Sequence, residues 1–233
     1  MAKDVIELIE LIGWREERSV HLFGISMGGM IGQELVNSSL SALQRLVQSG
    51  CSHSLLDHTF IVPLDPQTLQ WKGFVLFVKV FSRVLTKEQE CSLLIDTLFP
   101  PVFTNERLPN GCLRKEELYA RFLLLANLTP KQPLAGSLGQ LWGAVTHSLS
   151  RDALGKVSED LKPAKVLVLT GDSDEIINPA RSSELHKFLP GSELVIFKSG
   201  GHALCYQVPQ EFNALLERVM KEANARFSSN IDN

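Results

Sequence analysis

The feature that most constrains this chain is the pentapeptide Gly24-Ile25-Ser26-Met27-Gly28, which lies between an apolar run and a helical pattern. The run at 19–23 (SVHLF) predicts a short strand, and apolar residues recur at helical spacing after it. A serine in a tight strand-to-helix turn needs small neighbours, because the turn brings its flanking positions too close for side chains. The pattern therefore predicts a strained turn that presents Ser26. The alternative is an ordinary glycine-rich turn with an exposed serine.

Strand and helix patterns alternate at both ends of the chain. At the front we expect a helix over 3–12 ended by Gly13, the strand 19–23, a helix after Ser26 and a strand at 43–48. At the back we expect a strand at 165–170, a helix at 179–189, a strand at 193–197, a helix from 209 to about 225 and a loose tail over 226–233. This alternation predicts an α/β fold with a mostly parallel sheet.

The middle of the chain has a different character. Strand patterns vanish there, and helical stretches alternate with proline and glycine breaks such as Pro100, Gly111 and Pro133. We therefore expect three parts: residues 1–62 as the first part of the core, 63–155 as an inserted helical lid, and 156–233 as the second part of the core.

Two further polar turns follow predicted strands. Gly171-Asp172-Ser173-Asp174 comes after the strand 165–170, and Gly200-Gly201-His202 comes after the strand 193–197. Loops at the carboxyl ends of parallel strands meet at one edge of a sheet, where active sites of such folds lie. The order serine, acid, histidine predicts a triad of Ser26, Asp174 and His202. Asp172 stays open as a rival carboxylate or as the side chain of an Asx turn.

These segments resemble the α/β-hydrolase fold family, in its lidded branch described as hydrolase fold 1. The resemblance is carried by VHLFGISMGGMIGQEL, VLVLTGDSDEIINP and GGHALCYQVPQEF. It implies that Ser26 is the nucleophile of an elbow formed with Gly24 and Gly28, that His202 is the general base and that Asp174 orients the histidine. It also implies that the backbone amide of Met27 donates to an oxyanion hole.

The resemblance also implies residues before Met1. Family members carry further strands and a helix ahead of the segment that opens this chain, including a loop that supplies a second oxyanion amide. Loss of one such donor typically costs about 100 to 1,000-fold in turnover. We therefore expect a sheet that lacks its amino-terminal strands, with 19–23 as an exposed edge.

The implied activity is that of a serine hydrolase acting on a small or acyl-chain ester, a lactone or a thioester. A serine nucleophile argues against epoxide hydrolases and haloalkane dehalogenases, which use an aspartate at that position. An acyltransferase or a carbon–carbon bond hydrolase on the same triad stays open. A catalytically silent chain that binds a ligand or partner is the remaining alternative.

The composition of the chain limits which ligands and partners we expect it to bind. The net charge of −3 lacks the basic excess that nucleic acid requires, so we expect a small-molecule substrate. The four cysteines show no paired spacing and indicate free thiols, without a zinc site or disulfide framework, so we expect no cofactor or metal. The apolar segment 74–85 is too short to span a membrane and contains Lys79 and Arg83. We expect a cytoplasmic protein, with peripheral membrane contact by that segment left open.

Other polar residues give weaker signals. A metal site is conceivable where four of them crowd the sequence, but a polar loop after the second strand is the preferred interpretation; they are Cys51, His53, Asp57 and His58. Near the end of the predicted lid, His147 and Trp142 could face substrate, although helix packing is favoured. His21 is expected in the core and His186 on a solvated helix face.

Overall fold

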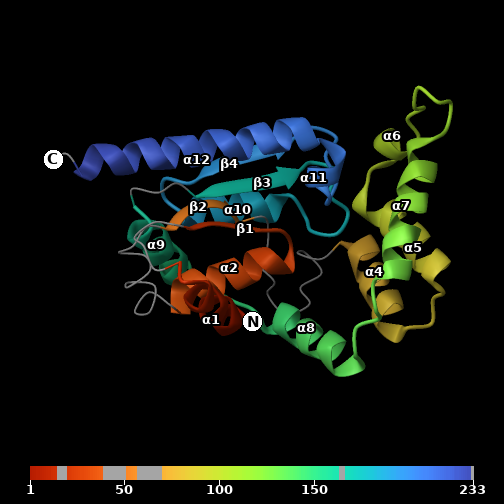
Figure 1. The fold of residues 1–233 in the computed structure, drawn as a ribbon, viewed down its shortest axis with the longest axis horizontal. Helices are drawn as coiled ribbons and strands as arrows, with labels where there is room; N and C mark the ends of the chain where they lie inside the picture. The colour runs from red at the N-terminus through yellow and green to blue at the C-terminus, as the bar shows by residue number, and fades with distance from the viewer. Residues whose placement is uncertain (15–19, 39–50, 57–69, 163–165, 232–233) are drawn as a thin grey trace.

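Two pairs of parallel strands form the centre of the molecule. The computed structural model describes residues 1–14, 20–38, 51–56, 70–162 and 166–231 of the 233-residue chain. Strand β1 (Val20–Gly24) pairs with β2 (Cys51–Leu56), and β3 (Leu167–Gly171) pairs with β4 (Glu193–Phe197). Because β2 also contacts β3, the strands lie in the order β1-β2-β3-β4 (Figure 1). The predicted α/β fold with a parallel sheet is confirmed.

Helices cover both faces of these strands. One face carries α2 (Met27–Ser38), α9 (Arg151–Asp160) and α10 (Ala180–Phe188), with α1 (Ala2–Ile12) packed on α2. The other face carries the long α12 (Pro209–Ile231), preceded by the short α11 (Leu204–Gln207) (Figure 1). The layers are those of a three-layer α/β protein.

Strand β3 is buried on both sides, and its side chains alternate between two cores. Leu167 and Leu169 pack with Phe212 and Val219 against α12. Val168 points to the opposite face, into the cluster formed with α2, α9 and α10. This period of two is what a strand produces, and a strand covered on both faces reads as a continuous apolar run. The run thus places Asp174, which follows it, at a rigid end of the sheet.

A helical segment, residues 70–146, lies beside the end of the sheet toward which the strands point (Figure 1). It contains α4 (Trp71–Ser82), α5 (Lys87–Leu98), α6 (Pro101–Thr104), α7 (Arg114–Leu128) and α8 (Leu134–Thr146). Its core of Ile95, Phe99 and Leu118 includes Ala203 from the loop after β4. The next helix, α9, crosses residue 155 and belongs to the core beneath the sheet.

Three expectations about individual elements are wrong. Helix α12 continues to Ile231 instead of ending near residue 225, since no glycine or proline follows Pro209 to stop it. Helix α1 buries Ile9, with Val5 and Ile6 against the same cluster, whereas Leu8 and Ile12 of the expected face are exposed.

The third error concerns the second strand. The structure places β2 at Cys51–Leu56, so Cys51 and His53 lie in a strand and not in the polar loop expected there. Their side chains, the expected strand at 43–48, and Asp57 and His58 lie outside the described residues. The start of β2 is set by its pairing with β1, in which Val20 lies opposite Cys51.

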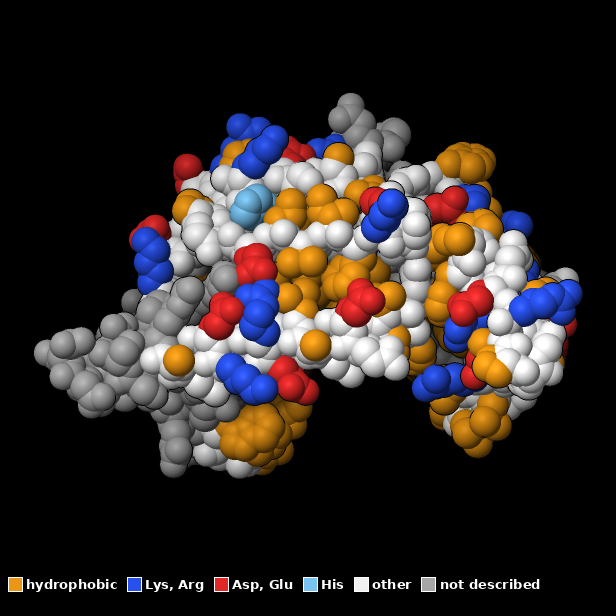
Figure 2. All heavy atoms as spheres, turned by 90° about the horizontal axis from the view of Figure 1, so that it is seen from above, with side chains coloured by type: hydrophobic (Ala, Val, Ile, Leu, Met, Phe, Trp, Pro, Cys, Tyr) orange, Lys and Arg blue, Asp and Glu red, His pale blue; other side chains and the backbone are white. Residues whose placement is uncertain are grey.

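Two observations bear on membrane and nucleic-acid contacts of the described residues. None of the helices described is both long enough and apolar enough to cross a membrane. On the face in Figure 2, acidic and basic side chains are interspersed among hydrophobic ones, and no continuous basic stripe crosses it. That pattern agrees with the small net negative charge.

Candidate active site

Ser26 occupies a strained turn between β1 and α2. Its φ angle is 54°, in the left-handed region that residues other than glycine seldom adopt. A Cβ on Gly24 would lie 2.4 Å from the carbonyl oxygen of Gly28, so only glycine fits at position 24. At Gly28 a Cβ would meet no described atom within 4 Å. The steric reason expected for both glycines therefore holds for Gly24 and is wrong for Gly28.

The turn also prepares backbone donors. The N–H groups of Gly28 and Gly29 donate to the carbonyls of Ile25 and Ser26, at 2.8 and 2.9 Å. Within the described residues, the N–H of Met27 takes no part in these bonds of the turn. Met27 is the first residue of α2, where free N–H groups and the helix dipole favour negative charge. An anion beside Ser26 would thus meet a helix N-terminus.

Asp174 is the carboxylate that the structure brings to the histidine. It is buried, and its Oδ2 lies 2.8 Å from Nδ1 of His202. Its Oδ1 accepts hydrogen bonds from the N–H groups of Ile176 and Ile177, at 2.8 and 3.0 Å. Asp172 is exposed and accepts a bond from the hydroxyl of its neighbour Ser173. Asp174 therefore also accepts the hydrogen bonds from the loop backbone for which the sequence had left Asp172 as a candidate.

His202 lies in the loop after β4 and is buried. With Nδ1–H donated to Asp174, the imidazole presents Nε2 as its proton acceptor. Its backbone N–H donates to the carbonyl of Leu98 at the end of α5, over 2.9 Å. The loop approaches α5 so closely that a Cβ on Gly201 would lie 2.5 Å from the same oxygen. The glycine before His202 is therefore required by the contact with the helical segment.

The side chain of Gln207 fixes the same loop from its other side. Its Oε1 accepts the N–H of Gly201 over 2.8 Å, and its Nε2 donates to the carbonyl of Ser199 over 2.6 Å. Sequence reasoning missed this residue. Its position five residues after His202, at the end of a short helix, carries no signal of the two bonds.

The helical segment also holds the aspartate loop, a contact that sequence reasoning missed. The side-chain amide of Gln70 donates to the carbonyl of Asp174, and its backbone N–H donates to Ile176 over 3.0 Å. Lys72 forms an ion pair with Glu175 at 2.6 Å. Gln70 precedes α4 and lies 104 positions from Asp174, so no local pattern could indicate the bond. The acid and the histidine are each tied to a different helix of this segment.

The three expected residues follow separate strands. Ser26 follows β1, Asp174 follows β3 and His202 follows β4, all at the carboxyl ends of parallel strands. Asp174 and His202 are joined directly, and Ser26 immediately precedes the helix that follows β1. Among the described residues, no group of histidine, cysteine, aspartate or glutamate side chains is placed to hold a metal ion. The arrangement can deliver a polarised imidazole without one.

The weaker candidates have structural surroundings. His147 is buried and bonds Glu34 through Nδ1 and Gln33 through Nε2, both at 3.1 Å. Burial lowers the pKa of its imidazole, and the nearby Glu34 carboxylate opposes that shift. Trp142 is exposed, and His21 is half-buried in β1. His186 is half-buried with Nδ1 2.7 Å from the hydroxyl of Ser192, so the helix face expected to be solvated is partly covered there.

Solved structures share this architecture at low sequence identity. A serine hydrolase from Cycloclasticus zankles aligns with a TM-score of 0.67 and 18% identity, over 94% of this chain and 69% of that one. A meta-cleavage product hydrolase from Pseudomonas fluorescens IP01 aligns with a TM-score of 0.65 and 16% identity, over 95% of this chain and 71% of that one. At such identities the likeness shows the fold alone.

The sequence itself matches known proteins as well. RutD of Escherichia coli O81 (strain ED1a), whose name describes a carbamate hydrolase, is 41% identical over 51 residues, which are 22% of this chain and 19% of that protein. The sequence pattern of the alpha/beta hydrolase fold family matches residues 16–209. Since that match covers more than half of the chain and the sheet and helices agree with it, the protein belongs to the α/β-hydrolase fold family.

Proposed function

We propose that this protein is a serine hydrolase that cleaves a small or acyl-chain ester, a lactone or a thioester through Ser26, His202 and Asp174. One observation carries the proposal: a buried histidine bonded to a buried aspartate over 2.8 Å lies at the sheet edge where a strained turn presents a serine. A buried imidazole that donates Nδ1–H to a carboxylate is oriented to take a proton at Nε2.

The chemistry follows from these groups. Ser26 Oγ attacks the carbonyl carbon while its proton moves to Nε2 of His202, and the carbonyl oxygen becomes an oxyanion near the N–H of Met27. The tetrahedral species collapses to an acyl-serine, and the imidazolium gives its proton to the leaving alcohol or thiol. Water then repeats the sequence and releases the acid. Asp174 stays ionised and stabilises the imidazolium.

The division of labour along the chain belongs to the same proposal. Residues 63–155 act as a lid over the site, and residues 1–62 and 156–233 form the catalytic core. The lid is supported by the bonds from Gln70 to Asp174 and from His202 to Leu98, which place helical residues at the acid and the histidine. A reducing, cytoplasmic location is supported by Cys91 and Cys112, which are free thiols.

The test is covalent labelling of the full chain by a fluorophosphonate probe, read by mass spectrometry. We expect label on Ser26 in the wild-type protein and in Ser148→Ala, a matched change at an exposed serine, and none in Ser26→Ala. A chain that is folded by circular dichroism but takes no label would support the silent binding protein instead. Label that persists in Ser26→Ala would overturn the nucleophile assignment.

Product analysis separates hydrolysis from its alternatives. With an acyl ester as substrate, a hydrolase releases the free acid even when an alcohol is present as competing acceptor. Transfer of most acyl groups to the alcohol would indicate an acyltransferase on the same triad.

A further inference from the structure

A half-open cavity lies among the helices of the helical segment. It measures about 360 Å³ and is bordered by α4, α5, α7 and the chain that leads into α8. Ser26, Asp174 and His202 are absent from its lining. The volume falls at the small end of the range, about 300–1,000 Å³, that small-molecule sites occupy in proteins. The cavity is large enough for a ligand of its own.

The apolar residues of the lining are together called the floor of the cavity. Leu85, Leu94, Phe122 and Leu125 line it together with the buried Cys91. Burial raises the pKa of the Cys91 thiol, so the thiol stays neutral at physiological pH and behaves as a small hydrophobic group. Such a floor favours a hydrocarbon chain, since apolar surface gains about 25 cal/mol per Å² when it leaves water.

The charged residues of the lining are called its rim, and most of them are cations. Arg83, Lys87 and Lys131 line it, opposed by the single carboxylate of Glu90, so positive charge exceeds negative charge by two. None of the ion pairs formed by the described residues involves these three cations. Their charges therefore line a cavity with an apolar floor, and no salt-bridge partner for them is found within the part of the chain that the structure describes.

Two of these cations are held in place by neutral groups. Nη2 of Arg83 donates to the carbonyl of Gln132 at 2.6 Å, and Nζ of Lys87 donates to Oδ1 of Asn127 at 3.2 Å. Arg83 ends α4 with a φ angle of 55°, at a position where glycine is the usual residue. The guanidinium of Arg83 is thus held at a strained helix end by neutral acceptors. Because these acceptors carry no negative charge, the positive charge of Arg83 remains available to bind an anion.

We propose that this cavity binds an amphiphilic carboxylate, with the hydrocarbon chain on the apolar floor and the carboxylate between Arg83 and Lys87. An arginine fork matches a planar carboxylate in shape, and charge-assisted hydrogen bonds are about twice as strong as neutral ones. The site is independent of the proposed hydrolysis, because its lining contains none of the triad residues.

Calorimetric titration of the full chain with octanoate, and with 1-octanol as its uncharged counterpart, tests the charge requirement. We expect octanoate to bind at least about tenfold more tightly than octanol, since hydrogen bonds to charged groups contribute about 1.5–3 kcal/mol. Arg83→Gln and Lys87→Gln should each weaken octanoate binding about tenfold and leave octanol binding unchanged. Equal affinities for octanoate and octanol, or no loss in either variant, would overturn the proposal.

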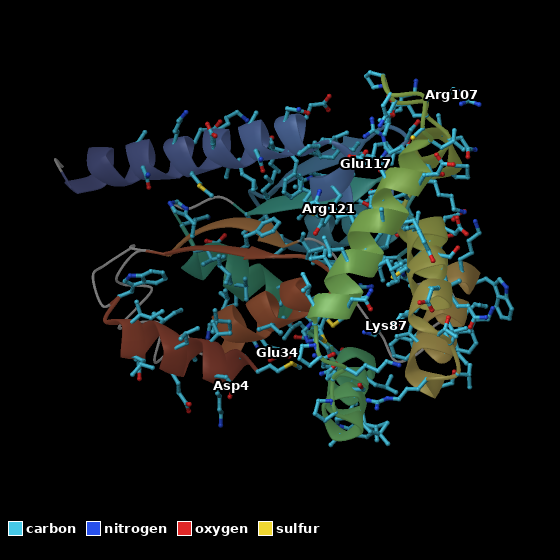
Figure 3. The ribbon with its side chains drawn as sticks, turned by 45° about the vertical axis from the view of Figure 1, so that its right-hand side comes forward. Asp4, Glu34, Lys87, Arg107, Glu117 and Arg121 are labelled. Carbon is cyan, nitrogen blue, oxygen red and sulfur yellow. The ribbon has the colours of Figure 1, made fainter. Side chains whose placement is uncertain are left out.

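Two control variants guard this result. Arg107 is an exposed cation at the opposite end of α7 from Lys87 (Figure 3), and Arg107→Gln should bind octanoate as the wild type does. Arg83→Lys keeps a positive charge at the strained position. The site is supported if Arg83→Lys still binds octanoate while a folded Arg83→Gln binds it more weakly. Equal loss in Arg107→Gln would show that general surface charge binds octanoate, against the proposal.

Alkylation of cysteines by N-ethylmaleimide locates the bound ligand. Octanoate should slow the modification of Cys91, which lines the cavity, and leave that of the exposed Cys112 unchanged. Octanoate should protect Cys91 equally well in Ser26→Ala. A missing serine label would therefore count against the proposed hydrolase, and missing protection of Cys91 would count against the cavity. Octanoate that binds without protecting Cys91 occupies another place, and the cavity assignment is then wrong.

Discussion

Two buried histidines in this protein each contact a carboxylate through Nδ1, and only one of the pairs lies where chemistry is expected. His202 contacts Asp174 over 2.8 Å, and His147 contacts Glu34 over 3.1 Å. The side chain of Asp174 is 2% exposed, whereas that of Glu34 is 39% exposed. A histidine bonded to a carboxylate is thus not by itself a catalytic feature.

The surroundings separate the two pairs. Asp174 is held by two backbone N–H groups in a loop after β3, and His202 follows the neighbouring strand. His147 ends α8 and packs against α2, with its second ring nitrogen facing the side chain of Gln33. The first pair sits at the sheet edge beside a serine turn, and the second joins two helices. Active sites of such folds lie where the carboxyl ends of the strands converge, which is why we assign the proposed chemistry to the first pair.

The largest expected effect separates the carboxylates. Asp174→Asn should lower turnover of an activated ester about 10,000-fold, because the amide favours the wrong imidazole tautomer. Glu34→Gln, the matched change in the other pair, should leave turnover within about threefold of wild type, because surface charges far from a site contribute little. Steady-state assays of the two variants measure this ratio. Comparable losses would erase the distinction between the pairs.

A second test concerns stability rather than catalysis. His147→Ala should lower the free energy of unfolding by about 1–3 kcal/mol, since the buried Gln33 side chain loses its partner. Urea denaturation gives that value, and the folded variant should still take the fluorophosphonate label on Ser26. His186→Ala, at a half-buried histidine, serves as control with a smaller loss. Absence of the serine label in folded His147→Ala would contradict a purely structural role.

Gln70 tests whether the helical segment helps to position the acid. Gln70→Ala removes one neutral hydrogen bond, which contributes about 0.5–1.5 kcal/mol, so turnover should fall roughly two- to tenfold. The pH dependence of kcat/KM should shift as well, because the loop that holds Asp174 is loosened. Lys72→Gln breaks the neighbouring exposed ion pair with Glu175 and should have little effect. An equal loss in both variants would point to docking of α4 as a whole.

The smallest effect is the pH dependence of stability at His147. Burial holds the pKa of its imidazole below the ordinary value of 6.5. The unfolded chain therefore binds a proton first as the pH falls, so this contribution is complete above pH 6.5 and is lost below it. The imidazole contacts Glu34 through Nδ1 and Gln33 through Nε2, so both side chains influence its titration.

The comparison that measures it is between wild type and His147→Gln. Free energies of unfolding at pH 7.5 and at about pH 5.5 should converge for the two proteins at the lower pH. A constant difference across that range would show that His147 does not titrate in it.

Local sequence patterns predicted those parts of the fold and site that depend on local geometry. The turn at Ser26 follows from a glycine that alone fits at position 24, and the strand before Asp174 follows from an apolar run buried on both faces. The pairing of Asp174 with His202 was predicted from the order of the turns along the chain.

What could not be predicted depends on contacts between distant segments. Gln70 and the carbonyl of Leu98 meet the acid and histidine loops from far along the chain, and their residue types carry no signal of it. The start of β2 is set by its pairing with β1, another contact between separate segments. The cavity at Arg83 arises only when three helices and the chain into α8 assemble.

The bonds between the helical segment and the two loops have a consequence for hydrogen exchange. The N–H of His202 is held by Leu98, and the N–H of Gly73 is held by the carbonyl of Glu175. The amide of His202 belongs to the core and that of Gly73 belongs to the helical segment. Each amide can exchange with solvent only when the segment and the core separate. Their protection should therefore rise and fall together, as in one cooperative unit. Opening of the helices would then dismantle the acid–histidine pair rather than merely uncover it.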